Sequence, residues 1–181
     1  MGEPIKLLTA NYVGNETYFG KKGEYTGNSF RVGADLLESK YGKLNVKYLF
    51  NTDTKNEVRP QCRFTAYSPD LKLGDFGDTK FKANFENWTT IKCNKMFETE
   101  DIANSARIKL KAQNGEYSAY SALKLDCSQT NPTPKFNGAT VGIQKNFGKK
   151  ISAYLEGYLP KESFQGKFSD TSYGIGLAMK F

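Results

Sequence analysis

The stretch TSYGIGLAMKF, residues 171–181, carries the pattern that decides the fold. Every second residue is apolar or aromatic: Tyr173, Ile175, Leu177, Met179 and Phe181. The residues between them are small or polar. Because successive side chains of a β-strand point to opposite faces, this spacing predicts a strand with one apolar face and one polar face.

The same alternation recurs along the chain between clusters of turn-forming residues. The Asn114–Gly115 pair, for example, separates two alternating segments and is typical of a tight hairpin. The pattern predicts an all-β, antiparallel chain that forms one domain over residues 1–181. The expected strands are residues 5–13, 29–39, 44–50, 58–66, 80–86, 107–112, 117–125, 139–147, 151–159 and 171–181.

Two segments leave the strand number open. Residues 71–76 form a short alternating piece among turn formers, and residues 90–97 fit either a strand or part of a large loop. If both are loops, the chain has ten strands, which is the number we expect. Twelve strands result if both are strands, and eight would require two clear segments to be loops.

The connections between the expected strands alternate in length. Short turns are expected at residues 40–42, 114–115 and 147–149, and long connections at 14–28, 128–138 and 160–170. In an up-and-down sheet, this order places the short turns at one end and the long loops at the other. Outer-membrane barrels have this asymmetry.

Composition argues against several other classes of protein. No apolar run approaches the roughly 20 residues of a membrane helix, and the mean hydropathy is −0.61 although 14% of residues are aromatic. The chain contains no His, which excludes Ser/His, Cys/His and His-metal sites within it. No two carboxylates stand at a defined spacing. We therefore expect no catalytic residues, no metal and no cofactor, and the chain is not predicted to be an enzyme.

Residues 171–181 resemble the C-terminal signal of bacterial outer-membrane β-barrel proteins, in which alternating apolar residues end in an aromatic residue. The resemblance implies a transmembrane antiparallel up-and-down β-barrel in the bacterial outer membrane, whose last strand closes against the first. It also implies that the barrel-assembly machinery reads the alternating set ending in Phe181, and that outer-membrane lipids and lipopolysaccharide surround the protein. A soluble lipocalin-like ligand-binding barrel is the alternative, because its strands also alternate.

If the apolar residues face lipid, the residues between them face the lumen. On three consecutive expected strands this lumen set is mostly basic, with Glu86 as its one acid. The basic members are Arg59, Arg63, Lys80, Lys82, Arg107, Lys109 and Lys111. Such a wall attracts anions and lowers the barrier to their passage.

These residues suggest a narrow channel or porin that favours small anionic solutes, and the basic wall resembles that of small porins for acidic sugars. Two alternatives remain. The lumen could be sealed by salt bridges and hydrogen bonds, or the barrel could act in adhesion, host interaction or resistance through its long loops. Nucleic-acid binding is not expected, because the basic residues alternate with a lipid-like face.

The three cysteines, Cys62, Cys93 and Cys127, form no CxxC pair, so a zinc cluster is not expected. The expected topology places Cys93 and Cys127 at the long-loop end. Because an oxidising compartment preserves disulfides, we expect a Cys93–Cys127 bridge and a free Cys62 thiol. The alternative is that all three thiols are reduced.

Overall fold

The computed structural model describes residues 6–181 except 56, 95–97, 129–131 and 166–170. Nearly all of the described chain is β-strand, and one short 3₁₀ helix, η1 (Lys161–Gln165), precedes the last strand. The strands are β1 Lys6–Gly20, β2 Tyr25–Ser39, β3 Gly42–Asp53, β4 Val58–Tyr67, β5 Leu71–Phe76, β6 Thr79–Cys93, β7 Thr99–Asn114, β8 Tyr117–Ser128, β9 Lys135–Phe147, β10 Ile151–Leu159 and β11 Ser172–Lys180. No helix among the described residues is long and apolar enough to cross a membrane.

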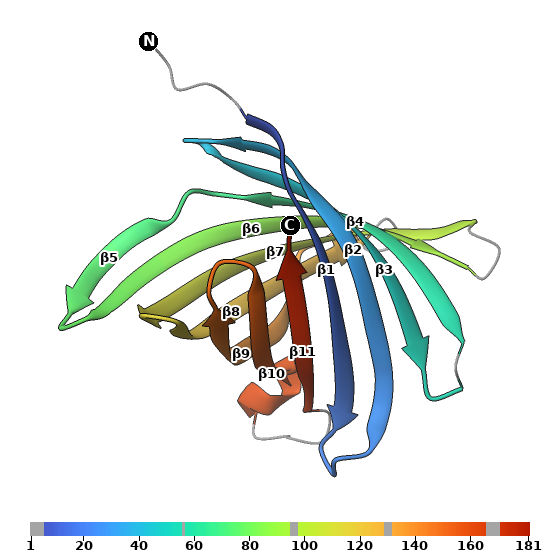
Figure 1. The fold of residues 1–181 in the computed structure, drawn as a ribbon. Coiled ribbons are helices and arrows are strands. Elements are labelled where there is room, and N and C mark those ends of the chain that lie inside the picture. The colour runs from blue at the N-terminus through green and yellow to red at the C-terminus, as the bar shows by residue number, and fades with distance from the viewer. Residues whose placement is uncertain (1–5, 56, 95–97, 129–131, 166–170) are drawn as a thin grey trace.

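Ten of these strands form a closed antiparallel ring (Figure 1). Consecutive strands pair with each other except β4 and β5, which both pair with β6, and β1 pairs with β11. The β1–β11 seam runs from Tyr12 opposite Lys180 to Gly20 opposite Ser172. The backbone of Phe181 continues the seam, since its N–H donates to the carbonyl of Asn11 at 2.7 Å. The predicted ten-stranded antiparallel barrel is confirmed.

Residues 71–76 and 90–93 are strand where we expected loops, yet the ring still has ten members. β5 follows β4 after a break at residues 68–70, and both strands pair with β6, as Tyr67 opposite Glu86 and Leu71 opposite Ala83 show. β5 therefore lies in line with β4 along the same side of β6 and extends the wall there. Residues 90–93 prolong β6 in the same way, while 95–97 lie outside the described residues.

The expected long connection at residues 14–28 is wrong. β1 continues to Gly20 and β2 starts at Tyr25, so only a tight turn separates them. Gly23 takes a positive φ of 83° in this turn, a backbone conformation that glycine adopts at little cost. The sequence misled here because its glycines and asparagines lie within strands, where glycine is normally unfavourable. The connection between β10 and β11 is long, as expected, and contains η1.

The two faces of the barrel are inverted relative to a soluble protein. Large apolar side chains cover the exterior; Leu177 and Ile143 are each 59% exposed. Polar side chains line the interior, where Asp35 and Asn45 are each 2% exposed. A lipocalin-like barrel would bury apolar residues inside, so that alternative is wrong. A closed barrel with this exterior pairs its backbone groups internally and presents apolar side chains to lipid, which confirms the predicted outer-membrane location.

The last strand has the predicted faces. Tyr173, Ile175, Leu177 and Met179 lie on the exterior, opposite Phe19, Thr17, Asn15 and Val13 of β1. Between them Gly174 and Gly176 face the lumen and are buried. The recognition of this segment by the barrel-assembly machinery stays a prediction.

The expected Cys93–Cys127 disulfide is corrected by the strand order. Cys93 lies on β6 and Cys127 on β8, with β7 between them; their register partners there are Thr99 and Asn104. Two strand spacings amount to about 10 Å, which exceeds the roughly 7 Å Cα separation that a disulfide can bridge. All three cysteines are free thiols.

The inverted faces predict opposite effects for two adjacent positions on β9. Replacing the exterior Ile143 by Arg places a charge in the hydrocarbon and should lower the free energy of unfolding by about 2–4 kcal/mol. Replacing the interior Gln144 by Arg should cost no more than about 1 kcal/mol, since it removes one hydrogen bond, to Asn146. Denaturant unfolding in lipid vesicles measures both values. Equal losses would mean that the faces are assigned wrongly.

Candidate functional site

Three cavities follow one another along the lumen. The loop-side cavity, of about 530 Å³, reaches Lys161 of η1, and the turn-side cavity, of about 730 Å³, reaches the β9–β10 turn at Gly148. The middle cavity, of about 610 Å³, shares Arg63 and Trp88 with the loop-side cavity and shares Lys47 with the turn-side cavity. Because they share wall residues, the three cavities adjoin one another inside the barrel.

Cations outnumber carboxylates around the middle cavity. The basic residues that line it are Arg31, Lys47, Arg63, Arg107, Lys109 and Lys124, and the acidic residues are Glu16, Glu86 and Glu156. They come from strands all around the ring, because each occupies a lumen-facing position in the alternation of its own strand. The positive charge is thus distributed around the lumen.

Glu86 is the shared counter-charge of two cations on β7. Its carboxylate lies 3.7 Å from Nη1 of Arg107 and 3.8 Å from Nζ of Lys109. Glu86 and Arg107 are only 4% and 7% exposed. Charged groups at this depth need partners, because leaving a buried charge uncompensated is strongly destabilising. Glu86 therefore offsets the repulsion between the cations Arg107 and Lys109 on this side of the lumen.

Trp88 fixes two guanidinium groups beside the middle cavity. Its ring centroid lies 4.6 Å from Cζ of Arg63 and 4.4 Å from Cζ of Arg107. The two arginines come from β4 and β7, the strands on either side of β6. Arg63 also donates from Nε to Oγ1 of Thr90 at 3.1 Å. Contact with the face of the indole helps to hold both guanidinium groups beside the cavity.

Glu16 organises the opposite side of the lumen. Its carboxylate forms an ion pair with Arg31 and accepts hydrogen bonds from the hydroxyls of Tyr18 at 3.0 Å and Tyr154 at 3.2 Å. Glu156 accepts a hydrogen bond from the Tyr120 hydroxyl at 2.5 Å. Each of these carboxylates is engaged by the wall itself.

Several lumen tyrosines lie directly opposite glycines on neighbouring strands. The cross-strand pairs are Tyr12–Gly33, Tyr18–Gly174, Tyr120–Gly142 and Tyr154–Gly176. A Cβ atom added at Gly142 or Gly176 would overlap the facing tyrosine ring. The glycines therefore let the rings lie along the wall, which leaves space at the centre of the barrel.

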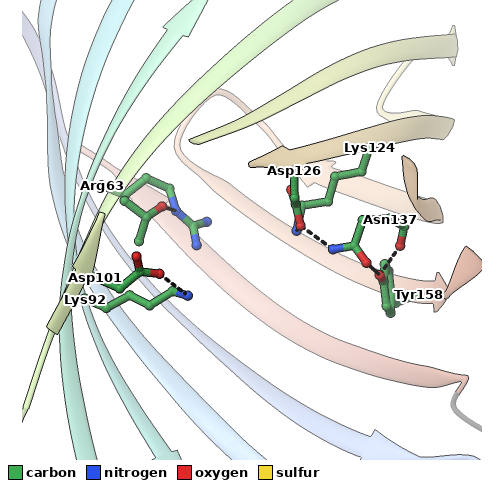
Figure 2. Close-up of polar contacts among 8 residues, drawn as sticks. Arg63, Lys92, Asp101, Lys124, Asp126, Asn137 and Tyr158 are labelled. Atoms are coloured by element: carbon green, nitrogen blue, oxygen red, sulfur yellow. Dashed lines mark hydrogen bonds and ion pairs between the residues drawn. The ribbon is translucent and has the colours of Figure 1, made fainter. Parts of the chain in front are cut away.

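Two groups of polar side chains face each other across the loop-side cavity (Figure 2). On one side, Lys92 pairs with Asp101 at 3.2 Å, near Arg63. On the other side, Lys124 pairs with Asp126 at 3.0 Å, and Asn137 donates a hydrogen bond to the same carboxylate. Figure 2 shows the two groups on opposite sides, and residues of both groups line the cavity.

The structure separates the seven predicted basic residues into two sets. Arg63, Arg107 and Lys109 line the middle cavity, and Lys111 lines the turn-side cavity. The other three, Arg59, Lys80 and Lys82, line none of the three lumen cavities.

Arg59 lies at a rim and is 64% exposed, 3.8 Å from Glu57. Lys80 and Lys82 lie on the part of β6 that pairs with β5, and β3 does not extend along this part of the wall. There Lys82 forms an ion pair with Asp70 at 3.0 Å. The sequence could not show this, because it does not give the relative shift of neighbouring strands.

Other lumen cations were absent from the predicted set. Arg31 and Lys47 alternate with exterior residues on their strands, and that alternation is the signal that could have identified them. The prediction considered one wall only. The Tyr–Gly pairs were also missed, because they depend on which residues of different strands lie opposite each other.

No protein-family model and no curated protein sequence matches the chain. Among solved structures, it is similar to the outer membrane phospholipase of Salmonella typhi, a dimer with bound calcium, at 11% identity and a TM-score of 0.38, over 94% of this chain and 90% of that one. The Escherichia coli outer membrane phospholipase A matches at 10% identity and a TM-score of 0.39, over 98% of each chain. OmpT, an outer membrane protein of Vibrio cholerae, matches at 9% identity and a TM-score of 0.34, over 98% of this chain and 97% of that one.

These names correct one expectation from the sequence. Two of the similar proteins are phospholipases, so a barrel of this general kind does not exclude catalysis, and the prediction that the chain is not an enzyme does not stand. At such low identity and TM-score, the likeness carries no information about what this chain binds or does. Its own lumen side chains must supply that argument.

The position of Glu86 predicts a large loss of stability when its charge is removed. Glu86→Gln leaves Arg107 and Lys109 without their shared carboxylate and should lower the free energy of unfolding by about 3 kcal/mol. Asp101→Asn is the matched control. It breaks the more exposed pair with Lys92 and should cost less than about 1 kcal/mol. Denaturant unfolding in detergent compares the two, and a loss for Glu86→Gln as small as the control would contradict this role.

Proposed function

We propose that the protein is a narrow outer-membrane channel that passes small anionic solutes. The observation that carries the proposal is the excess of cations in every section of the lumen. The loop-side cavity has Arg63, Lys92, Lys124, Lys135 and Lys161 against Asp101 and Asp126. The turn-side cavity has Lys43, Lys47, Lys111, Lys149, Lys150 and Lys180 against Asp35.

An anion that enters such a lumen meets an attractive potential along the whole path. Low-dielectric walls focus the field of the lining charges, so anions are concentrated and cations are repelled. The arrangement of the aromatic rings supports an open path as well, since the Tyr–Gly pairs keep the rings against the wall. Both features favour conduction over a lumen sealed by its own ion pairs.

The second candidate is a surface barrel that acts in adhesion, host interaction or resistance through its loops. The observation that favours it is the packing of η1 on the rim: the ring of Phe164 meets Phe136 of β9 edge-on at a centroid distance of 5.3 Å. This contact gives the described part of the β10–β11 connection a defined surface. Lipids and lipopolysaccharide around the apolar exterior belong to both proposals.

Reconstitution in planar bilayers tests the channel. The wild-type protein should conduct, and its reversal potential in a salt gradient should show anion preference. Replacing Lys109 and Lys111 together by Glu should abolish or reverse that preference, because both lysines line the lumen cavities. Lys145→Glu is the control, since Lys145 lies on the exterior over the rings of Tyr117 and Phe147.

The two possible failures have different meanings. A folded wild-type barrel that does not conduct would reject the channel and favour the surface barrel. Conduction whose selectivity is the same in the double variant and the Lys145→Glu control would show that the two lysines lie outside the path of the ions.

The Tyr–Gly pairs predict how the path could be narrowed. Gly142→Val fills the space beneath the Tyr120 ring, which must then turn toward the lumen. Single-channel conductance should fall in this variant and recover when Tyr120→Ala is added. If Gly142→Val folds and conducts as the wild type does, the lumen does not depend on the flat orientation of this ring.

A further inference from the structure

The positive charge of the middle cavity is only partly balanced by the protein. Glu16 is engaged by Arg31 and two tyrosines, Glu86 is shared by Arg107 and Lys109, and Glu156 accepts from Tyr120. Lys124 pairs with Asp126. Within the described part of the chain, no carboxylate lies within ion-pair distance of Lys47 or Arg63, and Glu86 and Asp35 act on Lys47 only from farther away.

Lys47 and Arg63 are nevertheless direct cross-strand neighbours in the β3–β4 register. Both face the lumen, and both also interact electrostatically with Arg31. Like charges directly opposite each other on a sheet are destabilising. Each is held by an aromatic ring, Lys47 over Tyr12 at 5.2 Å and Arg63 over Trp88 at 4.6 Å. These rings orient the two cations but do not neutralise them.

Several donors around the same cavity are buried without a hydrogen-bond partner among the described residues. They include Nε of Arg31, Nε of Arg107 and Nε1 of Trp88. A buried donor without an acceptor costs free energy, so each such group calls for an explanation. A ligand that carries several anionic oxygens would neutralise the Lys47–Arg63 pair, whereas the three buried donors are too enclosed to contact it directly.

We infer that the middle cavity is a binding site for a small oxyanion with at least two negative charges, either a polycarboxylate or a phosphate. Guanidinium groups match the geometry of carboxylate and phosphate oxygens, and cations exceed carboxylates here by three. Since Lys124 pairs with Asp126, two of these charges stay uncompensated, and a monovalent anion would balance only one of them. This oxyanion is also the solute class that we infer for the proposed channel. Its transport depends on the proposed function, whereas its binding requires only the folded barrel.

Trp88 provides a direct probe of this site, because it is the only tryptophan in the chain and it contacts Arg63 and Arg107. Its fluorescence can be followed in detergent-solubilised protein titrated with succinate, citrate, inorganic phosphate or acetate at constant ionic strength. We expect a saturable change with a multivalent anion and at least roughly tenfold weaker binding of acetate, since acetate forms fewer charge-assisted hydrogen bonds. Comparing succinate and citrate with phosphate identifies which oxyanion the site takes.

Lys47→Gln should weaken binding of the multivalent anion roughly tenfold. Lys47 stacks on Tyr12 rather than Trp88, so this variant removes a charge without altering the immediate contacts of the probe. Arg63→Gln provides a second variant, and the exterior Lys145→Gln should bind as the wild type does. Heat-modifiable migration on SDS gels confirms that each variant is a folded barrel.

Equal affinity for acetate and the multivalent anions, absence of saturable binding, or unchanged affinity in both folded lumen variants would each overturn the inference. The outcome is separable from that of the bilayer experiment. Binding without conduction would reject the channel and keep the site. Anion-selective conduction without saturable binding would keep the channel and reject the site.

Discussion

The rest of the structure depends on the closure of the sheet. β1 pairs with β11, and β4 pairs with β6, so the ten described strands of the ring close on one another, while β5 pairs with β6 alone. In a hydrocarbon solvent an unpaired N–H or C=O cannot bond to water, which makes an open sheet untenable. Because side chains alternate strictly along a strand, closure also assigns each residue to lipid or to lumen. The apolar exterior and polar interior both follow from this constraint.

Inside the closed wall, many of the charged side chains of the lumen are paired with one another. Glu86 holds two cations of β7, and Glu16 combines an ion pair with two tyrosine hydroxyls. These contacts satisfy the carboxylates but not all of the cations, so the lumen keeps a positive potential. The Tyr–Gly pairs add a steric condition, since the absence of a Cβ lets the rings lie against the wall. The positive charge of the lumen and the space at its centre thus both come from the side chains at the lumen-facing positions of the strands.

A barrel of this kind does not by itself define a function. Folds in general host unrelated activities. The functional argument for this chain therefore rests on its lumen side chains. Their most specific feature is a pair of like charges, Lys47 and Arg63, held face to face by their strands and by aromatic rings.

The sequence by itself determined the alternation, the antiparallel order and the two faces, because these depend only on the period of a strand. It also identified Arg63, Arg107, Lys109 and Lys111 as lumen residues. It could not assign residues 14–28 to strands, since glycine and asparagine resemble turn formers until their neighbours are known. The tertiary structure alone decided that β5 prolongs β4, that β7 separates Cys93 from Cys127, and that Lys47 lies opposite Arg63. Each of these depends on strand register, which is set by hydrogen bonds between residues distant in the chain and leaves no local pattern in the sequence.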